Sequence, residues 1–230
     1  MLNWNALGLR PEAEPADSGS MLDGMLITGQ AGFVNDTKVA SNMGWRKVQT
    51  LGIGDKVLTF DHGMQRIIDI QRETFAIPEP GLPASRLPVL VPRGALNNRS
   101  DMWLMPDQGL LVESDATRDA LGDPFAVVPA RALAGYRGIA SAPPPGAVEV
   151  TTLSFARDEV IYVEGGMLAH CPRPRQILIE PCDGEAMLYD VLDIAAAMSL
   201  VRGLIEGRQD AEFVCAPEEL AALPELARAS

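Results

Sequence analysis

Short apolar and β-branched runs, separated by turn residues, fill the sequence from about residue 25 to residue 170. Runs of this length, bounded by Gly, Pro, Asn and Asp, are typical of β-strands, because helices need longer amphipathic segments. We therefore expect a mainly β domain over residues 25–170. The predicted strands are MLIT (25–28), TKVA (37–40), WRKV (45–48), DKVLTFD (55–61), QRIIDIQRETF (65–75), PVLV (88–91), MWLM (102–105), GLLVE (109–113), FAVVPA (125–130), VEVTTLSF (148–155) and EVIYVEG (159–165).

Two tetrapeptides between these runs have the composition of hairpin loops. They are DHGM at 61–64 and PDQG at 106–109. The run at 65–75 alternates loosely between apolar and polar residues, which predicts one long strand with one face exposed to solvent.

The sequence after about residue 170 changes from strand-like runs to helical spacing. Ala, Leu and Met recur at helical intervals and predict a helix around Leu188 to Ile205. The segment at 216–230 opens with Pro and Glu, as helices often do. Residues 10–20 are rich in Pro, Glu, Asp, Ser and Gly and predict a tail. The predicted units are a tail at 1–24, a β domain at 25–170 and a helical extension at 171–230.

The charge of the chain disfavours nucleic acid as a partner. Acidic residues number 31 against 19 basic ones, and the net charge of -12 repels phosphate backbones. The N-terminus lacks the basic start and apolar run of a signal peptide, and no segment approaches the roughly 20 apolar residues of a membrane span. Three cysteines without a C-x-x-C pair fit free thiols of a reducing compartment. We expect a cytoplasmic protein, or one exported without a cleaved N-terminal signal.

The sequence contains few residues suited to metal or cofactor chemistry. Its two histidines, His62 and His170, belong to no H-E-x-x-H motif, and P-loop, dinucleotide-loop and G-x-S-x-G motifs are absent. We expect no metal and no cofactor. Asp61 and His62 are strand neighbours that point to opposite faces, so a turn is predicted there. For the same reason Asp158 and Glu159 are predicted to be a solvated pair.

The strongest ordered pattern lies in residues 32–61, GFVNDTKVASNMGWRKVQTLGIGDKVLTFD. This stretch resembles the N-terminal block of Hint domains, the fold shared by hedgehog autoprocessing domains and inteins, and especially bacterial Hint-domain proteins. LMPDQGLLV (104–112) is similar to the middle block of that family, and FARDEVIYVEGG (155–166) is similar to the late block. The resemblance covers roughly residues 25–170 and implies a Hint-like β fold with a helical C-terminal appendage. The positions that match in the first block are Phe33, Thr37, Val39, Gly44, Val48, Leu51, Gly54, Asp55, Val57, Leu58 and Asp61.

The resemblance implies self-cleavage chemistry, but the positions that would carry it are substituted. In the family, a Cys or Ser opening the first block attacks the preceding carbonyl and forms a (thio)ester, and this chain has Gly32 there. Met105 and Gln108 stand at the Thr and His positions of the middle block, and Gln has no proton to exchange near neutral pH. Asp158 stands where the late block often has His. We therefore expect no catalytic residue and no self-splicing or self-cleavage.

These departures predict a catalytically degenerate Hint-like domain that serves as a protein-binding or assembly module, with an unknown protein as its partner. The C-terminal helix is a second candidate surface, although packing against its own β domain is the favoured prediction. The residues expected to line a binding cleft are Phe33, Thr37, Gln108, Asp158 and His170.

Two alternatives stay open from the sequence. The first is an autoprocessing or hydrolytic enzyme that uses a nucleophile outside the family pattern, such as Ser41 or Cys171. The second is a structural subunit of a larger particle or secretion assembly.

Overall fold

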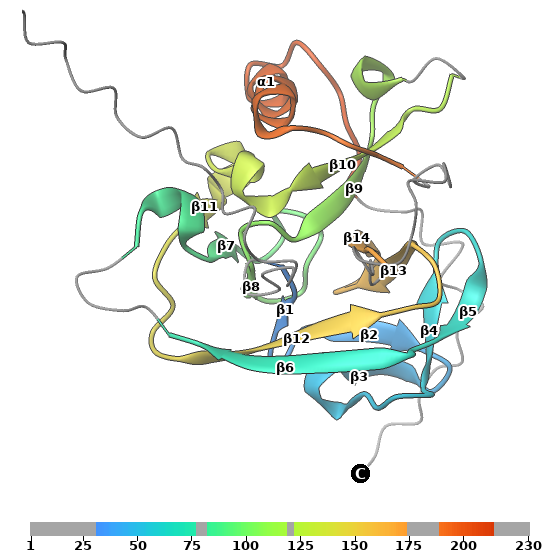
Figure 1. Ribbon diagram of the computed structural model, residues 1–230. Helices are drawn as coiled ribbons and strands as arrows, with labels where there is room; N and C mark the ends of the chain where they lie inside the picture. The colour runs from blue at the N-terminus through green and yellow to red at the C-terminus, as the bar shows by residue number, and fades with distance from the viewer. Residues whose placement is uncertain (1–30, 77–81, 119–121, 174–188, 214–230) are drawn as a thin grey trace, which may run out of the picture.

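Two β-sheets and one α-helix make up the part of the chain that the computed structural model describes, residues 31–76, 82–118, 122–173 and 189–213 (Figure 1). The first sheet has the strand order β11 (Ala140–Ser141), β7 (Val89–Val91), β8 (Met102–Leu104), β1 (Phe33–Val34), β12 (Val148–Ser154) and β6 (Asp69–Phe75). The second has the order β15 (Asp190–Val191), β10 (Phe125–Pro129), β9 (Gly109–Glu113), β14 (Met167–Cys171), β13 (Glu159–Val163), β2 (Lys38–Ser41), β4 (Lys56–Thr59) and β5 (Gly63–Arg66), with β3 (Gly44–Lys47) paired to β2. The prediction of a mainly β chain with a C-terminal helix is confirmed.

Strand β13 shows why its sequence is apolar at nearly every position. All five of its residues are buried. Ile161 and Val163 belong to the main hydrophobic core, whereas Val160 and Tyr162 belong to a second apolar cluster. Successive side chains of a strand point to opposite faces, so both faces of β13 are covered, as a continuous apolar run requires. Burying each side chain of this size stabilises the fold by about 1.5–3 kcal/mol.

The tetrapeptide DHGM forms the predicted hairpin loop, whereas PDQG does not. Strands β4 and β5 are antiparallel partners on either side of DHGM, with Thr59 opposite Gly63. Strands β8 and β9, on either side of PDQG, lie in different sheets, where β8 pairs with β7 and β1, and β9 pairs with β10 and β14. The hairpin prediction for 106–109 is therefore wrong, and this turn carries the chain from one sheet to the other.

The run at 65–75 contains two strands, β5 and β6, and not the single strand predicted. The chain breaks at Ile67, whose N–H donates to the Asp55 carbonyl and whose carbonyl accepts from the Gly54 N–H. The N–H of Ile68 then donates to the Ser154 carbonyl. The backbone groups at the break are therefore satisfied by different segments, and the chain leaves the second sheet for the first. Figure 1 shows β6 lying alongside β12 across one side of the molecule.

Helix α1 (Ile194–Ile205) begins later than the predicted helix around Leu188 to Ile205, because β15 occupies part of that range. The Asp193 side chain caps its N-terminus by accepting the Ala196 N–H at 2.8 Å. Ala197, Leu200 and Val201 are buried in the main core. The helix thus packs on its own β domain, on the side of the molecule away from β6 and β12 in Figure 1. No helix within the described ranges is long and apolar enough to span a membrane.

Short 3₁₀ turns connect several strands, at Val48–Thr50, Ala84–Arg86, Asp115–Thr117, Ala130–Leu133 and Tyr136–Gly138. The predicted strand at 25–28, the tail at 1–24 and the predicted helix at 216–230 lie outside the described residues.

Candidate functional site

The side chain of Gln108 joins three segments of the fold around the start of β1. Its Oε1 accepts the backbone N–H of Gly32 at 3.0 Å. Its Nε2 donates to the carbonyl oxygens of His170, at 2.9 Å, and Gly109, at 3.0 Å. The amide orientation is fixed by these contacts, because a flipped amide would place its NH₂ against an N–H donor and its oxygen against two carbonyls. Gln108 is only 2 % exposed, so its whole hydrogen-bonding capacity here serves the protein itself.

The peptide bond between Ala31 and Gly32 is contacted at both of its polar atoms. Gln108 binds the N–H, and the hydroxyl of Thr152, from the neighbouring strand β12, donates to the Ala31 carbonyl oxygen over 3.4 Å. The second contact is long and weak. This is the peptide bond that the resemblance marks as the one a first-block nucleophile would attack.

Gly32 has a conformation and surroundings that require glycine. Its φ is +127°, a value that residues with a side chain rarely adopt. A Cβ built on it would lie 2.7 Å from Cγ1 of Val150 and 3.0 Å from Oγ1 of Thr152. The space where a nucleophilic Cys or Ser would begin is therefore already occupied by β12.

Met105, the second position that the resemblance implies is substituted, is a core residue. Its side chain is fully buried in an apolar cluster with Val34 and Val150. Met105 therefore packs in the same cluster as Val150, whose side chain fills the space beside Gly32. It brings no polar group to the Ala31–Gly32 peptide.

Phe33 and Thr37, two residues of the predicted binding cleft, are also buried. The Thr37 hydroxyl donates to the Val34 carbonyl at 2.7 Å. Together with Gln108, these side chains could contact a partner only if the strands around them moved apart. His170 is half-buried and contributes its backbone carbonyl to the contact with Gln108.

Asp158 lies at the turn before β13, where its Oδ1 accepts the backbone N–H of Arg173 at 2.8 Å. Within the described residues, no hydrogen bond or ion pair joins Asp158 to Gly32 or Gln108. The structure thus brings Gly32, Gln108 and His170 together and gives Asp158 a separate partner.

Asp107, next to Gln108, is the titratable group of the PDQG turn. Burial raises the pKa of its carboxyl, while the positive charges of Arg131 and Arg86 oppose that rise. Its Oδ1 forms an ion pair with Nε of Arg131 at 3.1 Å. This pair connects the turn that presents Gln108 to the 3₁₀ segment Ala130–Leu133.

A polar cluster that the sequence did not predict lies between the DHGM turn and β13. Nδ1 of His62 is 3.1 Å from Oε2 of Glu159, whose side chain is buried. The prediction that Glu159 is solvated is therefore wrong, because His62 approaches from 97 residues away to pair with it. Asp61 has a different partner, the hydroxyl of Tyr189, which donates to it at 2.6 Å. Burial and the bond to Asp61 raise the pKa of Tyr189.

Comparison with models of known protein families shows which family the chain belongs to. A family model described as "Hint domain" matches residues 31–169, more than half of the chain. The chain belongs to the Hint domain family. The matched range starts at Ala31 and ends at Ala169. It therefore contains Gln108 and both residues of the Ala31–Gly32 peptide bond.

Solved structures of similar fold are inteins and an intein-like domain. One is the splice-inactive variant of the AceL NrdHF class 3 split intein, with 14% identity and a TM-score of 0.42, covering 64% of this Hint domain chain and 99% of that chain. A second is the bacterial intein-like domain from Clostridium thermocellum, with 11% identity and a TM-score of 0.41, covering 61% and 98%. A third is the MchDnaB-1 intein, with 11% identity and a TM-score of 0.37, covering 60% and 98%. No curated protein matches the sequence.

Ser41 and Cys171, the two candidate nucleophiles outside the family pattern, both lie in surroundings that oppose nucleophilic attack. The Ser41 hydroxyl is buried and donates to the Gly44 carbonyl at 2.7 Å within the β2–β3 turn. Cys171 is buried, and burial, followed by the charge of Glu159, raises the pKa of its thiol. A thiol is a poor nucleophile until it ionises, so this environment disfavours its use. Within the described ranges, no three His, Cys, Asp or Glu side chains are placed to hold a metal ion.

Proposed function

We propose that this Hint domain does not cleave itself and serves as a protein-binding or assembly module. The observation that carries the proposal is the hydrogen bond from the Gly32 N–H to Gln108 Oε1. Breaking the Ala31–Gly32 amide requires a nucleophile at its carbonyl and a proton for its departing nitrogen. Gly32 has no side chain to attack, and Gln108 accepts the N–H where a general acid would have to donate.

The surroundings of Gly32 support the same proposal. Because a Cβ would meet Val150, a nucleophilic side chain cannot be added here without displacing part of β12. The site is packed as a structural junction between β1, the PDQG turn and β14, with Gln108 bonded to all three.

The proposal is tested by the mass of the purified full-length chain. We expect the chain to keep its full mass of 24.7 kDa during incubation with dithiothreitol, which would trap a thioester. A fragment beginning at Gly32, or a dithiothreitol adduct ending at Ala31, would overturn the proposal. If cleavage occurred, Ser41→Ala and Cys171→Ala would show whether either residue supplied the nucleophile.

A further inference from the structure

Three large apolar side chains project into solvent from adjoining loops at the β2–β5 end of the second sheet. Ile53 is 67% exposed, Met43 is 56% exposed and Ile68 is 48% exposed. The loops are joined by backbone hydrogen bonds, from Asn42 to the Lys56 carbonyl at 3.1 Å and from Gly54 to the Ile67 carbonyl at 2.8 Å. An apolar patch that stays in water on a well-formed surface is a common mark of an interaction site.

Positive charges without a carboxylate partner flank these apolar side chains. Lys56 and Arg66 stand directly opposite each other on β4 and β5, a like-charge arrangement that is unfavourable unless an anion is near. Arg66 donates to the Gly54 carbonyl at 3.3 Å, and Arg72 donates to the Leu51 carbonyl at 2.7 Å. In the described part of the chain, none of these three cations forms an ion pair with an Asp or Glu.

The sequence segment that contains these residues is less acidic than the chain as a whole. Residues 31–76 contain six basic and five acidic residues, whereas the full chain has a net charge of -12. On a protein of net negative charge, the cations Lys56, Arg66 and Arg72 attract acidic partners at that place, whereas the acidic surface elsewhere repels them.

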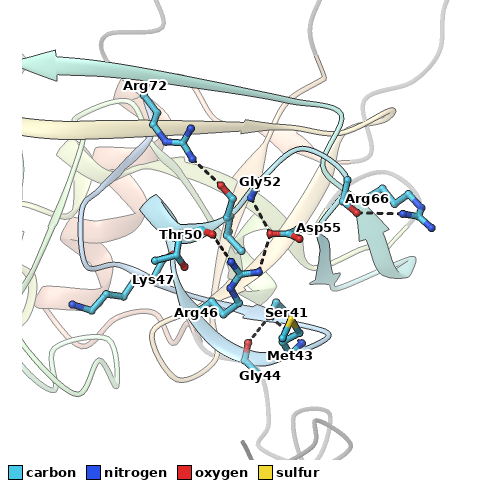
Figure 2. A network of polar contacts seen from close by, with 12 residues as sticks. Ser41, Met43, Gly44, Arg46, Lys47, Thr50, Gly52, Asp55, Arg66 and Arg72 are labelled. Carbon is cyan, nitrogen blue, oxygen red and sulfur yellow. Dashed lines mark hydrogen bonds and ion pairs between the residues drawn. The ribbon is translucent and has the colours of Figure 1, made fainter. Parts of the chain in front are cut away.

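The loop that carries Ile53 is held in place by polar contacts (Figure 2). Arg46 forms an ion pair with Asp55 at 2.8 Å, and the same Asp55 oxygen accepts the Gly52 N–H at 2.9 Å. Arg46 also donates to the Thr50 carbonyl. Figure 2 shows the contacts from Arg46 and Gly52 meeting at Asp55, with Arg72 and Arg66 reaching the same loop from two sides. A loop fixed before binding loses less conformational entropy when a partner docks.

We propose that Met43, Ile53, Ile68, Lys56, Arg66 and Arg72, hereafter the Ile53 surface, bind an acidic polypeptide segment with aliphatic side chains on a partner protein. This inference rests on the binding role proposed above and names its surface and partner chemistry. Carboxylates of the segment would pair with Lys56 and Arg66, and its aliphatic side chains would cover Ile53. A nucleic acid backbone could use the cations but has no aliphatic groups to cover the three apolar residues.

The experiment measures binding of the full-length chain to the fluorescein-labelled peptide GDELDDILEDG by fluorescence anisotropy. Two matched peptides replace either all acidic residues with their amides (GNQLNNILQNG) or all aliphatic residues with Ser (GDESDDSSEDG). We expect both matched peptides to bind at least about fivefold more weakly, and we expect raising NaCl from about 50 to about 300 mM to weaken the first complex.

Variants of the protein test the location of the complex. The double variant Lys56→Ala/Arg66→Ala and the single variant Ile53→Ser should each weaken binding about fivefold. The control Arg99→Ala/Arg157→Ala removes the same charge from exposed positions elsewhere and should leave binding unchanged within about twofold. Equal weakening by the control, no effect of Ile53→Ser, or tighter binding of a twelve-nucleotide oligothymidine would overturn the inference.

The outcome separates this inference from the proposed function. A chain that stays uncleaved but binds no acidic peptide contradicts the Ile53 surface and leaves the absence of self-cleavage intact. A chain that cleaves itself contradicts the proposed function, whatever the peptide does.

Discussion

Gln108 Oε1 accepts the N–H of Gly32, 76 residues earlier in the chain, at 3.0 Å. The pair occupies the two positions at which the Hint resemblance implies an acid and a nucleophile, and this chain has an amide at the first and no side chain at the second. The same Gln108 amide also donates to the carbonyl oxygen of His170 on β14, so this one side chain connects Gly32 to β14. We propose that a position that would serve catalysis in a self-cleaving relative serves stability in this chain.

Replacing Gly32 with Ala tests how tightly the site is packed. The added Cβ would lie 2.7 Å from Val150 Cγ1 at a backbone φ of +127°, so we expect a loss of about 3 kcal/mol in the free energy of unfolding. Urea denaturation measures it. The loss in the double variant Gly32→Ala/Val150→Ala should be smaller than the sum of the two single losses, because Val150→Ala removes the clashing methyl but not the backbone strain. Full additivity of the two substitutions would show that Val150 does not restrict this position.

Replacing Gln108 with Glu tests the amide's donor role. The introduced carboxylate could still accept the Gly32 N–H but would face the carbonyl oxygens of Gly109 and His170, so we expect a destabilisation of about 3 kcal/mol at pH 7. Burial there would raise the pKa of the introduced carboxyl, so the deficit should be smallest below its unfolded pKa of about 4.3 and grow as the pH rises. Gln65→Glu, at a half-buried position whose amide donates to the His62 carbonyl through a solvent-exposed hydrogen bond, is the control and should cost far less. A Gln108→Glu variant as stable as this control would argue against the network.

Two hydrogen-bond donors, the Gly52 N–H and the Arg46 guanidinium, lower the pKa of Asp55 in the loop that carries Ile53. The Gly52 N–H is the largest cause that lowers the pKa of Asp55, and Arg46 adds to it. Asp55 therefore stabilises the fold above its unfolded pKa of about 3.9, and this contribution is lost as the pH falls through the lower folded value. NMR titration of the Asp55 carboxyl in Arg46→Ala should give a pKa that rises only part of the way to the ordinary value. A complete return would show that Arg46, and not the backbone, is the main cause.

Cys171 should behave as a buried and unreactive thiol. Burial raises its pKa, so its contribution to stability is present below the unfolded pKa of about 8.5 and declines at higher pH. In a Cys182→Ser/Cys215→Ser background, Ellman's reagent should label the folded protein at pH 8 far more slowly than the protein unfolded in urea. Equal rates in the two states would mean that Cys171 is accessible and would revive it as a candidate nucleophile.

Most of the β architecture follows from local sequence patterns, because apolar runs of four to seven residues and their turns carry the strand signal. The errors arise where distant segments decide the outcome. PDQG has the composition of a hairpin loop, but β8 and β9 pair with different sheets. The run at 65–75 breaks at Ile67 because the backbone there bonds to residues 54 and 55.

The candidate site was predictable in its residues but not in its geometry. The resemblance places Gly32 and Gln108 at matching positions, and the chemistry of glycine and glutamine already argues against catalysis. The bond between them, the filled space beside Gly32 and the burial of Gln108 depend on β12 and β14, which approach from more than 60 residues away. For the same reason no local signal could reveal that Glu159 is buried against His62.

The most direct test of the central claim is peptide mapping of the Ala31–Gly32 bond in the wild-type chain after prolonged incubation at several pH values. The account predicts that the tryptic peptide ending at Lys38 is recovered with this bond intact at every pH. A peptide that begins at Gly32, growing in amount with time, would contradict it.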